Sequence, residues 1–264
     1  METEQLEKFK VWFDDYVAGF YGDDPYVNAN LKLKEDHTRR TCAEMLYLAE
    51  ELALPENQKR IADVIALFHD IGRFTQFVKY RTYNDPRSEN HCLLGLDVLR
   101  QTNILEPVAA EERELIERAI EYHGLRELPD DLDGQCLLFS KMIRDADKLD
   151  IFYLTTEAYA GYAENPDEFE LEVELPDEPY CSPGVLEAVL AGRLVDYSEL
   201  KTLNDMKLFQ LGWVYNINFT PTLRRIQQQD FLKTLFGFLP NNEDIERAKE
   251  KILAYVDFRI ERDA

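Results

Sequence analysis

The side chains that could bind metal ions are concentrated in the first half of the chain. All four histidines fall there: His37, His69, His91 and His123. Asp70 follows the second histidine directly, and Asp145 and Asp147 come shortly after the last one. Neutral imidazole beside carboxylate is the usual ligand set for iron, manganese, cobalt and zinc. The distribution favours one metal site, although four scattered histidines could also be surface or core residues that share no task.

Asp70 is suited to bridge two cations, because a carboxylate has two oxygens that can each bind one. Adjacent helical residues point about 100° apart, so His69 and Asp70 share a centre only if it lies between them at a helix end. One cation could be completed by His37, His69 and Asp147, and the other by the remaining two histidines. Two cations about 3.5–4 Å apart can bind a bridging hydroxide and stabilise a developing phosphoryl charge.

Helices must position these residues, since apolar side chains recur every three or four positions through nearly the whole chain. The pattern predicts helices over residues 4–20, 34–52, 55–70, 88–101, 110–122, 135–159, 184–195, 198–216, 219–237 and 243–261. The run Gly-Asp-Asp-Pro at 22–25 would separate the first two. Gly72 would end the third in a left-handed conformation, and Ser88 would cap the fourth. Residues 73–88 are expected to form a loop.

The fold class predicted from this pattern is all-α, with residues 1–264 forming a single domain. Residues 160–264 would be a C-terminal helical extension that packs on the first six helices. Within it, residues 169–175 (FELEVEL) alternate apolar and acidic side chains, so a short acidic β-arm could form there.

Composition and charge narrow the range of partners. The chain is 45% hydrophobic and 31% charged, which fits a globular protein, and its net charge is −22. Such a charge opposes binding to nucleic acid polymers and anionic membranes. A small anionic substrate remains compatible, because bound divalent metals can reverse the field inside a site. The charged start of the chain and the lack of a long apolar stretch predict a cytoplasmic protein.

The four cysteines stand alone in the sequence, without any Cys-x-x-Cys pair, which predicts reduced thiols. Cys92 directly follows His91 and could be a ligand or a nucleophile. A lone cysteine is more commonly a small buried apolar residue, and both interpretations stay open.

The order of the candidate ligands, with its local sequence, resembles the HD superfamily of metal-dependent phosphohydrolases. Four segments carry the resemblance, namely ALFHDIGRF, SENHCLLG, AIEYHG and IRDADKLD. They cover about residues 30–155, which would form the metal-binding core of an HD-type helical bundle. The last segment matches the closing A-D-x-L pattern of the family, which favours Asp147 over Asp145 as the final ligand.

The resemblance implies a dinuclear centre with six metal ligands. These are His37, His69, Asp70, His91, His123 and Asp147. It also implies two divalent ions (Mn, Fe, Co, Mg or Zn) and hydrolysis of a phosphoester or phosphoanhydride by metal-bound hydroxide. The expected substrate is a nucleotide or another small phosphorylated metabolite, and a homodimer is one arrangement that the sequence leaves open.

Several residues near the ligands could contact such a substrate. Arg73 follows the His-Asp pair by three residues, and its guanidinium could hold a phosphate bidentately. Lys148 could support a phosphate or pair with a neighbouring aspartate. These two residues, with Asp70, are the predicted catalytic groups. The basic and aromatic segment 73–88 adds Lys79, Arg81 and Tyr83 as predicted substrate contacts, although such a segment could equally be core plus solvated rim.

Two other functions remain open for the same ligand set. The HD superfamily includes mixed-valent di-iron oxygenases that share these six ligands. The third hypothesis is a non-catalytic HD domain used for sensing. A domain that no longer catalyses a reaction has no reason to keep all six metal ligands. No GYP sequence follows the core, so cyclic-dinucleotide cleavage of that type lacks support.

Overall fold

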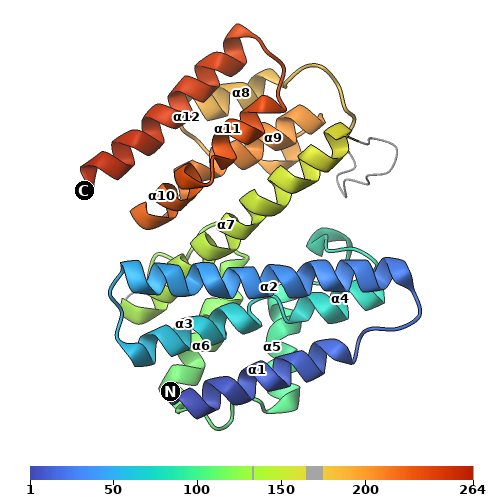
Figure 1. The fold of residues 1–264 in the computed structure, drawn as a ribbon, viewed down its shortest axis with the longest axis vertical. Helices are drawn as coiled ribbons and strands as arrows, with labels where there is room; N and C mark the ends of the chain where they lie inside the picture. The colour runs from blue at the N-terminus through green and yellow to red at the C-terminus, as the bar shows by residue number, and fades with distance from the viewer. Residues whose placement is uncertain (133, 165–174, 264) are drawn as a thin grey trace. The chain divides into compact units, whose positions relative to one another are not determined.

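The computed structural model describes residues 1–132, 134–164 and 175–263, and within these ranges the regular structure consists of helices with no strand. The all-α prediction is therefore confirmed. The chain divides into two compact units, Met1–Asp147 and Lys148–Ala264 (Figure 1). The single-domain arrangement stays a prediction. The β-arm expected at 169–175 lies outside the described residues except for Leu175, which has no regular structure.

The first unit is built from helices that each bury one apolar face. They are α1 (Thr3–Ala18), α2 (Pro25–Glu51), α3 (Glu56–Phe68), α4 (Gly72–Tyr80), η1 (Asp85–Arg87), α5 (His91–Thr102), α6 (Ala110–His123) and the start of α7 (Gly134–Glu164). Helix α3 packs against α1, α2 and α6, while α5 packs against α4 and α6 (Figure 1). The residues of α3 from Ile61 onward are buried, so this helix is enclosed up to its C-terminal end.

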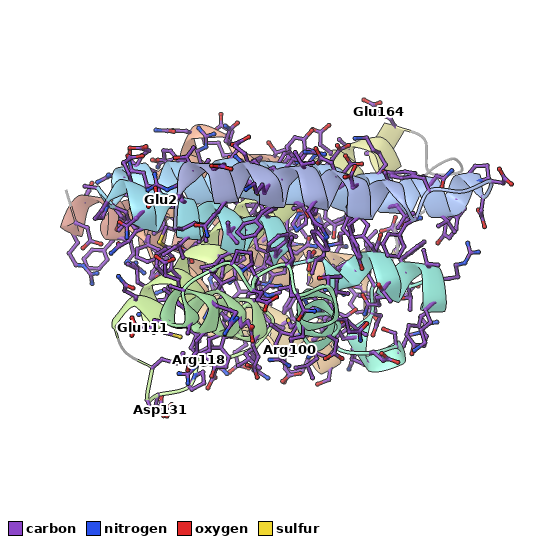
Figure 2. The ribbon with its side chains drawn as sticks, turned by 90° about the horizontal axis from the view of Figure 1, so that it is seen from below. Glu2, Arg100, Glu111, Arg118, Asp131 and Glu164 are labelled. Atoms are coloured by element: carbon purple, nitrogen blue, oxygen red, sulfur yellow. The ribbon has the colours of Figure 1, made fainter. Side chains whose placement is uncertain are left out.

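Phenylalanines fill much of the core of this unit. Phe13, Phe68, Phe74 and Phe77 are fully buried. Phe13 meets Phe74 edge to face with ring centroids 6.0 Å apart, and Phe9 meets Phe68 in the same way at 5.8 Å. Such pairs add to the free energy gained by burying the rings. The outer side is charged instead, as Arg100, Glu111 and Arg118 show on α5 and α6 (Figure 2).

Helix α2 begins nine residues before the predicted start at residue 34. The predicted break at 22–25 does separate α1 from α2, but it is also the start signal of the second helix. The Asp24 side chain accepts hydrogen bonds from the backbone N–H groups of Tyr26 and Val27, and Pro25 occupies the first helical position. Proline is favoured there because its missing N–H would have no helical partner.

The loop prediction for residues 73–88 was wrong over its first half, where α4 forms. Phe74 and Phe77 are spaced by three and bury one helix face, a signal that the surrounding basic residues obscured. Gly72 does not adopt the predicted left-handed conformation. It begins α4, and a Cβ atom at this position would lie 2.2 Å from the His91 carbonyl oxygen and 2.5 Å from the Gly95 nitrogen. Glycine is needed because α4 and α5 approach so closely.

The cap of α5 also differs from the prediction. The helix begins at His91, and the side chain of Asn90 accepts a hydrogen bond from the Leu93 N–H at 3.0 Å. Asn90 is therefore the N-cap in place of Ser88. The Ser88 hydroxyl instead donates to the Asn84 carbonyl oxygen.

The second unit continues α7 and adds shorter helices. They are α8 (Pro183–Leu190), η2 (Tyr197–Glu199), α9 (Leu203–Leu211), η3 (Gly212–Asn216), α10 (Thr220–Gln228), α11 (Phe231–Gly237) and α12 (Glu243–Arg262). The predicted helix 219–237 is divided because Asp230 has φ of 54°, in the left-handed region. The predicted helix 198–216 begins only at Leu203, after the side chain of Thr202 caps it. Among the described residues, the helices lack the combined length and apolarity needed to cross a membrane.

Candidate metal centre

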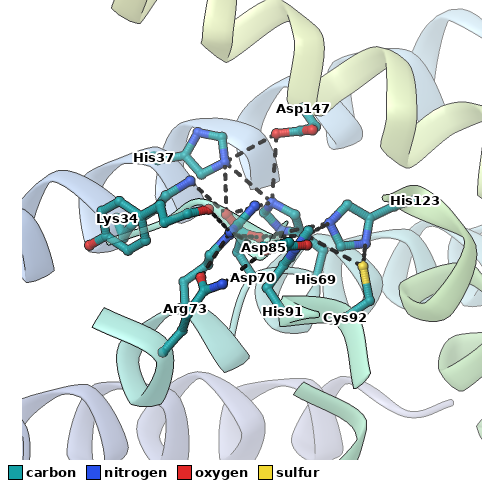
Figure 3. A network of polar contacts seen from close by, with 12 residues as sticks. Lys34, His37, His69, Asp70, Arg73, Asp85, His91, Cys92, His123 and Asp147 are labelled. Carbon is teal, nitrogen blue, oxygen red and sulfur yellow. Dashed lines mark hydrogen bonds and ion pairs between the residues drawn. The ribbon is translucent and has the colours of Figure 1, made fainter. Parts of the chain in front are cut away.

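The six predicted metal ligands come together from five helices of the first unit (Figure 3). They are His37 in the middle of α2, His69 and Asp70 at the end of α3, His91 at the start of α5, His123 at the end of α6 and Asp147 on α7. The four histidines and Asp70 are buried, and the Asp147 side chain is 21% exposed. Three of the helices therefore bring a ligand at a terminus, where the chain turns and side chains from different directions can converge.

One half of the cluster is formed by His37, His69 and Asp147 with one oxygen of Asp70. His37 Nε2 lies 3.3 Å from His69 Nε2, 3.2 Å from Asp147 Oδ1 and 3.5 Å from Asp70 Oδ2. His69 Nε2 lies 3.8 Å from Asp70 Oδ2 and 3.9 Å from Asp147 Oδ1. We call this group the first half.

The other half is formed by His91 and His123 with the second oxygen of Asp70. The two Nε2 atoms lie 3.1 Å apart, and Asp70 Oδ1 is 3.6 Å from His91 Nε2 and 3.7 Å from His123 Nε2. We call this group the second half. The two carboxylate oxygens of Asp70 thus face different halves, which is the arrangement a bridging ligand needs.

Hydrogen bonds at Nδ1 fix the orientation of three of the four imidazoles. His69 Nδ1 donates to the Ala66 carbonyl at 2.7 Å, and His123 Nδ1 donates to the Ile120 carbonyl at 2.6 Å. His91 Nδ1 lies 2.6 Å from Asp85 Oδ2. Carbonyl and ionised carboxylate oxygens only accept, so a ring proton sits on Nδ1, and in the neutral form of each imidazole the Nε2 lone pair faces the centre.

The donor set fits divalent cations in both halves. Two ligand atoms that bind one cation at about 2.1 Å are about 3.0–3.4 Å apart in octahedral or tetrahedral geometry. The imidazole pairs, at 3.3 Å in the first half and 3.1 Å in the second, fall in this range. Two lone pairs that face each other at this distance repel unless a proton or a cation lies between them. A cation in each half would satisfy them together with the carboxylates.

Two basic side chains keep Asp70 ionised. Lys34 Nζ lies 2.9 Å from Asp70 Oδ2, and Arg73 Nε lies 3.4 Å from Asp70 Oδ1. Burial opposes the charged form, but Lys34, His69 and Arg73 outweigh it and hold the pKa of Asp70 well below its usual range. Lys34 was not among the site residues predicted from the sequence. It precedes His37 by three residues, so it lies on the same face of α2 one turn earlier.

The protonation of the histidines differs across the centre. Burial lowers the pKa of His69 to about 3, so this imidazole is neutral at pH 7 and ready to bind a cation. Burial also disfavours the charged form of His123, but Cys92 and Asp70 outweigh it and raise its pKa well above the usual value. A cation bound to His123 takes the place of that proton, so metal uptake is expected to release protons.

Arg73 lies at the centre, with its Nε atom 3.4 Å from Asp70 Oδ1, but its described hydrogen bonds stay within the protein and its substrate role stays a prediction. Besides Asp70, its guanidinium donates through Nη1 to Asp85 at 2.9 Å, to Gln76 at 2.8 Å and to the Tyr83 carbonyl at 2.6 Å. Gln76 in turn donates to Asp85 at 2.8 Å. These contacts join a bridging carboxylate to the carboxylate that orients His91. Asp85 gave no sequence signal, because it begins the short 3-10 helix η1 and lies outside the helices that apolar periodicity predicts.

The other predicted substrate contacts are distributed differently. Tyr83 lies beside the centre, with its ring centroid 5.3 Å from Lys34 Nζ and 5.9 Å from Arg73 Cζ. Lys79 pairs instead with Glu89 at 2.7 Å, and Arg81 pairs with Asp24 at 2.7 Å. The substrate roles of all four residues stay predictions.

The structure distinguishes the two candidate closing aspartates. Asp147 reaches the first half directly, whereas Asp145, two residues earlier on α7, points about 200° away around the helix. Arg144, also on α7, donates to the carbonyls of His123 and Arg126, and so holds the chain that follows α6. Lys148 comes one residue after Asp147 and is half-buried, and its catalytic role stays a prediction.

The comparisons with known proteins agree with this geometry. The family model of the HD domain matches residues 35–151, a segment that contains all six converging side chains. Residues 35–151 are therefore an HD domain, which implies a superfamily of the metal-dependent hydrolase type. No curated protein matches the chain, and no solved structure does.

Proposed function

We propose that this protein is a metal-dependent phosphohydrolase that cleaves a phosphoester or phosphoanhydride bond in a nucleotide or another small phosphorylated metabolite. The observation that carries the proposal is the placement of Asp70. Its two oxygens face two separate pairs of Nε2 atoms, each at 3.5–3.8 Å. Two divalent cations bound there would supply an activated water and would stabilise charge on a phosphoryl group.

The residues around the centre have distinct tasks in this proposal. Asp70 and Asp147 supply the anionic ligands, and the Nδ1 hydrogen bonds keep the imidazoles aimed inward. Lys34 Nζ donates a hydrogen bond to Asp70 Oδ2 at 2.9 Å and keeps that carboxylate charged. Arg73 fixes Asp70 relative to the carboxylate that orients His91. These groups are in place before substrate arrives, so little reorganisation accompanies binding.

Charge explains how an acidic protein can accept an anionic substrate. The chain has a net charge of −22, which opposes approach of a phosphate. Two divalent cations contribute more positive charge than the two ligand carboxylates remove, and Lys34 and Arg73 add to it. The local field at the centre is therefore positive, which favours a small phosphate over a long anionic polymer that would also meet the acidic surface.

The test is phosphate release by the purified chain with Mn²⁺, Co²⁺ or Fe²⁺, against a panel of nucleotides and phosphomonoesters. Asp70→Asn keeps the size of the side chain but loses the bridging charge. Loss of a residue that only supports a metal ligand lowers activity by up to about 100-fold. Because Asp70 is itself a ligand in this proposal, we expect the activity of Asp70→Asn to fall by more than that. Asp36→Asn is the matched control, since Asp36 pairs with Lys32 on the exposed side of α2.

The outcomes separate the alternatives. Full activity in folded Asp70→Asn would contradict the proposal. Oxygen uptake by the iron-loaded protein, with no phosphate release on any substrate, would identify the oxygenase chemistry instead. Absence of bound metal and of activity would point to the non-catalytic sensing role.

A further inference from the structure

Cys92 lies against the second half of the metal centre. It is the second residue of α5 and is 2% exposed. Its Sγ atom is 3.4 Å from His91 Nε2 and 3.6 Å from His123 Nδ1 (Figure 3). One donor atom from each of these three residues lies within 4.8 Å of the other two. The thiol therefore belongs to a cluster of buried metal-binding groups.

Gly124 gives independent evidence that this position is shaped around the sulfur. Its φ of −83° is one that any residue adopts, so the backbone does not require glycine here. A Cβ atom at this position would lie 2.7 Å from Cys92 Sγ and 3.2 Å from His91 Cε1. Any side chain would displace the sulfur or the imidazole. The glycine after His123 thus leaves the space in which Cys92 lies against the ligands.

We propose that Cys92 Sγ is a fourth protein ligand of the cation held by His91, His123 and Asp70. The proposal rests on the metal centre of the proposed function and adds a ligand to it. Nitrogen at about 2.1 Å and sulfur at about 2.3 Å from one cation are about 3.1–3.6 Å apart at octahedral to tetrahedral angles. The 3.4 Å between His91 Nε2 and the sulfur falls in this range. The thiol proton leaves to solvent when the sulfur binds the cation.

The two halves then differ in the metals they prefer. The first half offers two imidazoles and two carboxylates, a set that accepts hard ions such as Mn²⁺ and Mg²⁺. The second half offers two imidazoles, one carboxylate oxygen and a thiolate. Thiolate favours Zn²⁺, Co²⁺ and Fe²⁺ over Mg²⁺ and Mn²⁺. The chain is therefore expected to hold two different metals when both kinds are present.

Cobalt titration of the full chain tests the ligand directly, because a thiolate bound to Co²⁺ gives a sulfur-to-cobalt charge-transfer band in the near ultraviolet. We expect this band in the wild-type protein and its loss in Cys92→Ser and Cys92→Ala. Cys42→Ser is the matched control, since Cys42 lies on α2 with its sulfur 3.9 Å from the Asp63 carbonyl oxygen. Zinc X-ray absorption should show a sulfur neighbour at about 2.3 Å that disappears in Cys92→Ser.

Competition between metals supplies a second measurement. Cys92→Ser should lower the Zn²⁺ affinity of one site by at least about tenfold and leave the Mn²⁺ affinity of the other unchanged. Binding of two Co²⁺ ions without a sulfur band would refute the ligand role and leave the phosphohydrolase proposal intact. Failure to bind Co²⁺ at all would refute both. A band that persists in Cys92→Ser and Cys92→Ala would also refute the assignment.

Discussion

Replacing Asp85 by asparagine should weaken metal binding in one half of the centre, although Asp85 is not itself a predicted ligand. Its Oδ2 lies 2.6 Å from His91 Nδ1, while its Oδ1 accepts from Arg73 at 2.9 Å and from Gln76 at 2.8 Å. An amide has one acceptor and one donor end. Either end leaves a mismatch, because all three neighbours of the carboxylate donate.

The mismatch has a calculable cost. If the amide nitrogen faces His91, the ring proton moves to Nε2 and the lone pair that binds metal is lost. If the amide nitrogen faces Arg73 and Gln76 instead, its N–H group meets two other hydrogen-bond donors and both of their hydrogen bonds are lost. Removal of an outer-sphere partner of a metal-bound histidine lowers affinity about 10–100-fold, or about 1.4–2.7 kcal/mol. We expect a loss of this size in the second half and little change in the first.

Calorimetric titration of the metal-free protein measures the effect, because two classes of site can be resolved in one experiment. Asp14→Asn is the matched control, since Asp14 pairs with Arg39 on an exposed surface. Far-ultraviolet circular dichroism checks that both variants fold. Equal affinities of wild-type and Asp85→Asn protein at both sites would refute the argument that Asp85 orients His91. An equal loss at both sites would show that the effect is not confined to the second half.

Two further predictions concern stability. Gly72→Ala should lower the free energy of unfolding by about 1–3 kcal/mol or more, because its Cβ would lie 2.2 Å from the backbone of α5. Gly22→Ala is the control, since no atom lies within 4 Å of a Cβ at that position. Thermal denaturation compares the two variants, and equal melting temperatures would contradict the close packing of α4 and α5. Burial opposes ionisation of Asp85, but His91 and Arg73 outweigh it and lower its pKa from 3.8 to about 2, so its charged form stabilises the metal-free protein above about pH 4 and this contribution is lost as the pH falls through 2. Acid denaturation should therefore be less steep for Asp85→Asn over this window, and superimposable curves would count against the ion pair.

The sequence predicted the fold class and the convergence of ligands because both depend on patterns that persist over many residues. Apolar periodicity predicted residues 110–122 and 243–261 as helices close to the observed α6 and α12. Local signals with two meanings were harder to interpret. Asp24-Pro25 was taken as a break but also starts α2, and Gly72 was taken as a helix end but permits two helices to touch.

The surroundings of the ligands could be predicted less well, because they depend on distances between segments remote in sequence. Arg73 was predicted to hold phosphate, and its position three residues after the His-Asp pair gave no indication that it would bind Asp85. The contact between Lys34 and Asp70 spans 36 residues and requires the packing of α2 on α3. Sequence spacing gives the direction of a side chain along its own helix, but the partner is set by tertiary structure.

The supports of the three oriented imidazoles differ in how they respond to mutation over evolutionary time. His69 and His123 are held by main-chain carbonyls, which every amino acid supplies, so substitutions at Ala66 or Ile120 leave the acceptor in place. His91 depends on one side chain, and a single base change converts an aspartate codon to asparagine. A single substitution can therefore weaken metal binding in the second half while the first half keeps its geometry. A substitution at residue 85 is therefore the shortest mutational route from this chain to a descendant that binds one metal.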